Sequence, residues 1–252
     1  MAGSVYAEVD AASRVATLWI DNPERRNALS VEMWRSIPEV VAQIELDPAV
    51  QVVCVRGSAG LFSAGADISE FGTERSGAAS AAYDRLTEAA ALAIAQCRLP
   101  VVALVEGYCF GGGVTLAVAC DLRFGVEGCS MSIPAARLGT LYPHAALERL
   151  RGLVGAGVAR YMLFAAPRFD AGAMLQAGLA ERVFSSGAVA AKAIADMARL
   201  APLTQQGAKL QLGGTLDGSE LEELSARIFA SADYAEGVAA FGEGRKPGFK
   251  GR

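Results

Sequence analysis

The sequence predicts an α/β protein in which helices cover a mostly parallel sheet. Two observations carry this prediction. Short β-branched runs alternate with longer helical patterns through the first half of the chain, and small-residue segments follow two of those runs. Such alternation is typical of parallel strands joined by crossover helices. From about Pro143 the pattern is helical, and the composition changes near Pro202, so we expect a core over 1–200 and a helical C-terminal region over 201–252.

The expected strands are short, β-branched and bounded by turns, and they cover 15–20, 50–56, 101–106, 122–124 and 130–133. Ser30 is a suitable N-cap for a first helix that runs to about Leu46 with apolar residues at helical spacing. The other expected helices cover 80–96, 111–119, 145–153, 155–165, 171–177, 188–200, 204–213, 219–231 and 233–242.

Composition excludes several classes of protein. The 252 residues include 23 basic and 27 acidic side chains, and the net charge of −4 argues against a nucleic-acid surface. The five cysteines show neither a CxxC pair nor a metal-ligand spacing, so we expect buried, reduced thiols in a cytoplasmic protein without a metal site. The N-terminal ten residues lack the pattern of a secretory signal. The most apolar window, 100–120, is interrupted by Glu106 and four glycines, which favours a buried strand, turn and helix over a membrane span.

Two small-residue segments are the chemically informative motifs, Phe62-Ser63-Ala64-Gly65-Ala66-Asp67 and Gly111-Gly112-Gly113. Each follows a predicted strand, where glycine lets the backbone approach a ligand closely. We expect the N–H groups of Ala64 and Gly112 to converge on one point about 3 Å from each, the geometry of an oxyanion hole. Taken alone, the glycine run is equally compatible with tight packing of a helix on a strand.

Together the two motifs resemble those of the crotonase superfamily, also called the enoyl-CoA hydratase/isomerase family. The matching stretches are 21–29, 62–68, 106–113, 120–123, 134–139 and 245–252. The resemblance implies a spiral of ββα repeats and C-terminal helices that support a homotrimer or a dimer of trimers. It also implies an acyl-CoA thioester as substrate, with coenzyme A as part of that substrate and no separate cofactor.

The resemblance further implies a coenzyme A site made of loop residues and basic side chains, namely Arg25, Arg26, Ala28, Ala66, Asp67, Ile68, Lys246 and Lys250. Basic side chains would bind the coenzyme A phosphates. Two alternatives stay open at this point. The basic C-terminal end could be a solvated tail, and Asp67 could cap the helix after its loop instead of taking part in chemistry.

The chain departs from the family at the two glutamates with which hydratases hold and activate water. Thr115 and Ala135 stand at those positions, and neither side chain is an acid or base at neutral pH. We therefore expect no ordinary hydration. Tyr142, which matches a tyrosine of decarboxylating members, and His144, the single histidine, are the candidate acids or bases, with Glu148 placed to orient the imidazole. Alternatively, His144 faces solvent at the start of a helix.

The sequence thus predicts an enzyme that stabilises the enolate of an acyl-CoA thioester through an oxyanion hole. Two alternatives remain: an acyl-CoA decarboxylase or isomerase that uses Tyr142 or His144, and a coenzyme A-binding protein without catalysis. Nicotinamide dependence has no support, because the glycine run is not G-x-G-x-x-G.

Overall fold

The centre of the computed structural model, which describes residues 3–214 and 216–252, is a six-stranded sheet. Its strand order is β1-β2-β3-β4-β6-β9; β1 runs antiparallel to β2, and every other neighbouring pair is parallel. The mostly parallel sheet is therefore confirmed. The strands are β1 (Ser4–Asp10), β2 (Val15–Asp21), β3 (Val52–Gly57), β4 (Val101–Val105), β6 (Leu122–Val126) and β9 (Arg182–Phe184).

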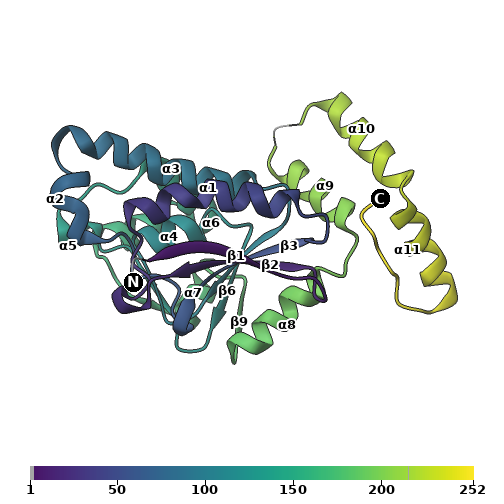
Figure 1. Cartoon of the computed structure of the whole chain (residues 1–252), viewed down its shortest axis with the longest axis horizontal. Coiled ribbons are helices and arrows are strands. Elements are labelled where there is room, and N and C mark those ends of the chain that lie inside the picture. Colours follow the sequence, from purple (N-terminus) through teal and green to yellow (C-terminus); the bar gives the residue numbers. More distant parts are fainter. Residues whose placement is uncertain (1–2, 215) are drawn as a thin grey trace.

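Helices cover both faces of this sheet (Figure 1). On one face lie α1 (Val31–Leu46), α3 (Ser80–Gln96), α4 (Gly112–Ala117) and α6 (His144–Phe164), and on the other lies α8 (Gly187–Met197). Because both faces are covered, β4 is buried along its whole length and its sequence is a continuous apolar run. The Ser30 hydroxyl caps α1 by accepting from the Met33 N–H, as predicted.

A second, three-stranded sheet holds the segments that become the site. It contains β5 (Tyr108–Phe110), β7 (Ser130–Ser132) and β8 (Phe169–Asp170), in the order β5-β7-β8. The remaining helices of the core are short: α2 (Phe71–Glu74), α5 (Ala135–Leu138) and α7 (Ala171–Gln176). The strands β1, β5, β8 and β9 were not predicted, and three of them are only two or three residues long, too short to show a periodicity.

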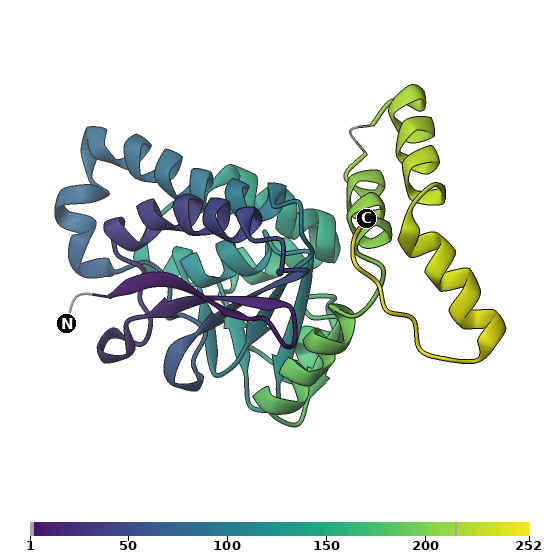
Figure 2. The ribbon, with the colours of Figure 1, turned by 45° about the vertical axis from the view of Figure 1, so that its right-hand side comes forward.

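The C-terminal arm consists of α9 (Pro202–Leu212), α10 (Gly218–Phe229) and α11 (Ala232–Glu243), followed by a tail. Figures 1 and 2 both show this arm projecting from the side of the core that lies away from α2. The tail returns along α11, where the Asp233 carboxylate accepts from the N–H groups of Lys250 and Gly251, both at 2.7 Å. Helix α9 begins at Pro202, two residues before the predicted helix 204–213.

Candidate active site

One pocket of the core is lined by residues from five separate parts of the chain: the start of α1, the loop after β3, the α2–α3 region, the start of α4, and the stretch around α5. The lining residues are Trp34, Ala64, Gly65, Ala66, Ile68, Phe71, Arg75, Tyr83, Thr87, Gly111, Gly112, Thr115, Ile133, Pro134, Ala135, Leu138, Thr140, Leu141, Tyr142 and Pro143. Both predicted small-residue segments therefore reach the same pocket.

The loop after β3 directs successive N–H groups to different partners. The Ser63 N–H donates to the carbonyl of Tyr108 at 2.8 Å, which ties the loop to β5. The Ala64 N–H donates to the carbonyl of Arg26 at 2.9 Å. The prediction that Ala64 supplies an oxyanion donor therefore has to be corrected, because its N–H is already committed, although the residue lines the pocket.

Ala66 occupies the place that was predicted for Ala64. It forms a parallel β-bridge with Leu29. In this bridge the Leu29 N–H donates to the Gly65 carbonyl at 2.8 Å, and the Asp67 N–H donates to the Leu29 carbonyl at 2.9 Å. In such a bridge, the N–H of the central residue points away from its partner. A Cβ built on Gly112 would lie 3.1 Å from the Ala66 nitrogen, so the Ala66 N–H lies beside Gly112.

Gly112 is the first residue of α4, where an N–H has no partner inside the helix. A side chain is excluded here, because a Cβ would also lie 2.9 Å from the Trp34 ring. Gly65 faces the same restriction: its φ is +106°, and a Cβ would lie 2.8 Å from the Phe110 carbonyl. The glycines thus allow two strand-to-helix segments to approach closely, and they bring the Ala66 and Gly112 amides together.

A buried hydrogen-bond chain supports this arrangement from behind. The Thr115 hydroxyl donates to the Tyr142 oxygen at 2.9 Å, and the Tyr142 O–H donates to the carbonyl of Gly111 at 3.0 Å. That carbonyl belongs to the same peptide group as the Gly112 N–H. Burial raises the pKa of Tyr142 well above its usual value, so the phenol keeps its proton at neutral pH. Tyr142 therefore orients the Gly111–Gly112 peptide.

The two positions where family hydratases carry glutamates, Thr115 and Ala135, both line the pocket. None of the described lining residues is acidic. Arg75 and Tyr83 also line the pocket, and sequence reasoning missed both, because nothing in their local sequence marks them. Burial raises the pKa of Tyr83 to about 12, although the neighbouring Trp34 indole lowers it.

His144 is not brought to the pocket. It is the exposed first residue of α6, the solvent-facing alternative considered above, and only the preceding Pro143 lines the pocket. Glu148 does not orient the imidazole either, since its exposed carboxylate accepts from Arg151 at 2.6 Å. The prediction of a catalytic His144 is therefore not supported by this geometry.

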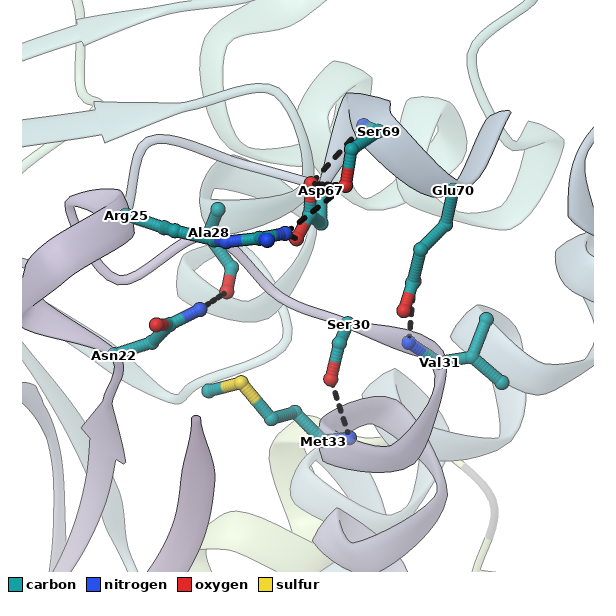
Figure 3. A network of polar contacts seen from close by, with 9 residues as sticks. All are labelled: Asn22, Arg25, Ala28, Ser30, Val31, Met33, Asp67, Ser69 and Glu70. Carbon is teal, nitrogen blue, oxygen red and sulfur yellow. Dashed lines mark hydrogen bonds and ion pairs between the residues drawn. The ribbon is translucent and has the colours of Figure 1, made fainter. Parts of the chain in front are cut away.

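The predicted coenzyme A loop lies against the pocket-lining segment (Figure 3). Arg25 forms an ion pair with Asp67 and donates to the Ser69 hydroxyl at 2.9 Å. Asp67 accepts from the Ser69 N–H at 3.0 Å, which confirms the predicted cap. Burial opposes ionisation of Asp67, but hydrogen bonds from Ser69 and Arg25 prevail and lower its pKa. The Ala28 carbonyl accepts from the Asn22 side chain at 2.8 Å, so Asn22 fixes the shape of the loop.

The remaining predicted coenzyme A residues fall into two groups. Arg26 and Ile68 are exposed, and Ile68 lines the pocket. Lys246 and Lys250 are exposed on the tail of the C-terminal arm, which Figures 1 and 2 show far from α2, the helix whose Phe71 lines the pocket. One chain therefore does not bring these two lysines to its own pocket.

Three further findings bear on the expected classes. All five cysteines are buried and none forms a disulfide. Over residues 3–214 and 216–252, no group of three or more His, Cys, Asp or Glu side chains is arranged to hold a metal ion. In the same part of the chain, no helix combines the length and apolar character needed to cross a membrane.

Comparison with known proteins gives consistent matches along almost the whole chain. The family model described as "Enoyl-CoA hydratase/isomerase" matches residues 10–252. A Mycobacterium tuberculosis relative named "Probable enoyl-CoA hydratase echA6" is 34% identical over 247 residues, covering 95% of this chain and 97% of the relative. A peroxisomal Delta(3,5)-Delta(2,4)-dienoyl-CoA isomerase of Arabidopsis thaliana is 30% identical, covering 94% and 93%. The crystal structure of a "Putative enoyl-CoA hydratase/isomerase family protein" from Hyphomonas neptunium superposes with a TM-score of 0.90 at 36% identity, covering 98% of both chains.

Proposed function

Because the chain belongs to the enoyl-CoA hydratase/isomerase family, whose fold it shares, we propose that its pocket binds an acyl-CoA thioester and stabilises the enolate through the Ala66 and Gly112 amides. The observation that carries this proposal is the close approach of these two amides at one pocket. Two N–H groups directed at one carbonyl oxygen favour the negative charge that develops there. Each such donor is worth about 2.7–4 kcal/mol in a transition state.

The loop beside the pocket supplies groups suited to coenzyme A. Arg25 and Arg26 are exposed cations that would pair with its phosphates. Asp67 would act indirectly by holding Arg25, while Ala28, Ala66 and Ile68 would contact the thioester arm. Because Lys246 and Lys250 lie on the arm, they would contact only a coenzyme A molecule that is bound in the pocket of a neighbouring copy.

A homotrimer, or a dimer of trimers, is supported by the surface of the C-terminal arm. Large apolar side chains are exposed on α9, α10 and α11, among them Leu212 (89%), Phe229 (61%), Val238 (58%) and Phe241 (90%). Tyr234, Val238 and Phe241 line one groove of the arm, and apolar surface gathered in this way is typical of an interface. We propose that neighbouring copies cover it.

The pocket is poorly suited to ordinary hydration. Thr115 and Ala135 offer no carboxylate to hold or activate water, and the Thr115 hydroxyl is engaged by Tyr142. The loss of general acid–base help alone costs about 10²–10⁴-fold in rate. A decarboxylase or isomerase that used Tyr142 as its acid would first have to release that O–H from the Gly111 carbonyl.

A panel of enoyl-CoA, malonyl-type and aromatic acyl-CoA thioesters tests the proposal, with binding measured by calorimetry and turnover by absorbance. We expect acyl-CoA binding and negligible hydration of crotonyl-CoA. Turnover of any other member would identify the reaction, whereas tight binding without turnover across the panel would favour the non-catalytic alternative. Hydration at the rate of an ordinary hydratase, or failure of every thioester to bind, would contradict the proposal.

A further inference from the structure

One wall of the pocket offers hydrogen-bond donors without acceptors to match them. This donor wall is formed by Trp34, Arg75 and Tyr83, all of which line the pocket. Arg75 and Tyr83 are in contact, since the guanidinium carbon lies 5.1 Å from the centre of the Tyr83 ring. Among the described residues, no hydrogen bond joins these three side chains to Thr115, Tyr142 or Gly111, and the enolate chemistry proposed above makes no use of their polar groups.

Arg75 is the one charged side chain among the described residues that line the pocket. Its side chain is only 14% exposed, yet its nearest carboxylate, that of the half-exposed Asp84, is 3.8 Å away. Its hydrogen bond, to the Leu141 carbonyl at 3.0 Å, uses one of five N–H donors. Stacking on the rings of Phe71 and Tyr83 holds the guanidinium in place, so a cation stands at the pocket with only this long ion pair to Asp84 to compensate its charge.

Trp34 and Tyr83 add two buried polar groups that lack partners. The Trp34 side chain is 1% exposed and Tyr83 5%. The indole lies close enough to the phenol oxygen to lower the pKa of Tyr83, yet no hydrogen bond of normal geometry joins either group to a described residue. A buried polar group without a partner carries a desolvation cost. An acceptor placed at this wall would relieve that cost and would also neutralise Arg75.

We propose that the donor wall recognises a carboxylate on the acyl group, so that the preferred substrates are coenzyme A thioesters of dicarboxylic acids. The proposal rests on the function proposed above, since it assumes that an acyl-CoA occupies the pocket. A carboxylate matches the planar donor fork of Arg75 and accepts from the O–H and N–H of the other two side chains. No carboxylate of the described lining residues competes with it for the guanidinium.

Calorimetry on matched pairs tests this specificity directly: malonyl-CoA against propionyl-CoA, succinyl-CoA against butyryl-CoA, and glutaryl-CoA against valeryl-CoA. Hydrogen bonds to charged groups contribute about 1.5–3 kcal/mol, so we expect at least one dicarboxylic thioester to bind about 10–100-fold tighter than its neutral partner. Equal affinities within every pair, or tighter binding of the neutral members, would overturn the inference while leaving the proposed function intact. If no member of any pair binds, the proposed function fails, and this inference fails with it.

Variants separate recognition from a purely structural role of Arg75. Arg75→Gln should abolish the preference while leaving the affinity for the neutral thioester within about threefold, and Arg75→Lys should restore part of it. Tyr83→Phe, which removes only a hydroxyl, should reduce the preference about 2–10-fold. Arg149→Gln is the matched control, because Arg149 is a partly buried arginine paired with Glu88 and not among the lining residues. If Arg75→Gln reduced the affinity for both members of a pair equally, Arg75 would only hold the loop at Leu141 in place, and the inference would be wrong.

Discussion

The pocket and the C-terminal arm are each incomplete in a single chain, but in different ways. At the pocket what is missing is mainly polar: the Ala66 and Gly112 amides and the Arg75 guanidinium lie at a space whose described lining residues include no carboxylate. On the arm the backbone is well capped, and what is missing is apolar contact, as at Phe241. The difference indicates two kinds of partner, a polar small molecule at one end and another protein surface at the other.

The most sensitive point of the pocket should be Gly112. In Gly112→Ala the new Cβ would meet the Trp34 ring at 2.9 Å and the Ala66 nitrogen at 3.1 Å, which forces the two amides apart. We expect turnover of any acyl-CoA substrate to fall about 10²–10³-fold, the usual effect of losing an oxyanion donor. Gly72→Ala is the control, since a Cβ there meets nothing within 4 Å. Equal activity of the two variants would show that these amides do not form the site.

On the arm, the substitution with the largest expected effect is one that introduces a charge. Phe241→Asp places a carboxylate on a side chain that is 90% exposed in one chain, so a monomer would tolerate it. If copies bury this ring, the loss of about 1.5–3 kcal/mol per side chain should weaken assembly at least about tenfold. Sedimentation velocity measures the effect, with Phe241→Leu as the apolar control. A stable monomer of the unmodified protein at micromolar concentration would contradict the interpretation of the arm.

Tyr142→Phe tests how the Gly112 amide is oriented, because it removes the hydrogen bond to the Gly111 carbonyl, together with the acceptor of the Thr115 hydroxyl. A neutral hydrogen bond contributes about 0.5–1.5 kcal/mol, so we expect roughly a 2–10-fold loss of turnover with little change in affinity. The infrared stretch of a carbon-13 thioester carbonyl should shift less on binding, because the Gly112 N–H is less well oriented. His144→Ala should change neither quantity, and a larger loss there than in Tyr142→Phe would reverse the roles assigned to these residues.

The buried thiols of the core make the stability of the fold depend on pH. Burial raises the pKa of Cys54 to about 12 and that of Cys97 to about 11, from 9.0 in the unfolded chain. The folded state therefore holds protons that the unfolded state loses above pH 9, and stability should fall by about 1.4 kcal/mol per pH unit for each thiol between pH 9 and 11. Urea unfolding measures this slope. Cys54→Ala should reduce it, and an unchanged slope would show that Cys54 does not carry it.

Much of the fold could be predicted from the sequence because its signals are local. β-branched runs indicated the central strands, and Ser30 indicated the start of α1. The second of the two helices predicted within α6 was expected to begin at Gly155, where the φ of +73° interrupts α6. The small-residue segments located the pocket for the same reason. The predicted boundary between the core and the helical region remains a prediction.

The choice between neighbouring amides could not be predicted, since it depends on contacts distant in sequence. Ala64 and Ala66 are both small residues beside Gly65. They differ because the Ala64 N–H donates to the Arg26 carbonyl, whereas the β-bridge with Leu29 leaves the Ala66 N–H pointing away from Leu29. Arg75 and Tyr83 reach the pocket only through tertiary packing. His144 follows a lining residue, but the start of α6 leaves it exposed.

A crystal structure with butyryl-CoA bound would show whether the Ala66 and Gly112 amides form the oxyanion hole, because it locates the thioester oxygen. We predict that this oxygen lies about 2.7–3.1 Å from both the Ala66 and Gly112 nitrogens, with the Ala64 N–H still donating to Arg26. A thioester oxygen bound to the Ala64 N–H, or held away from Gly112, would contradict the account.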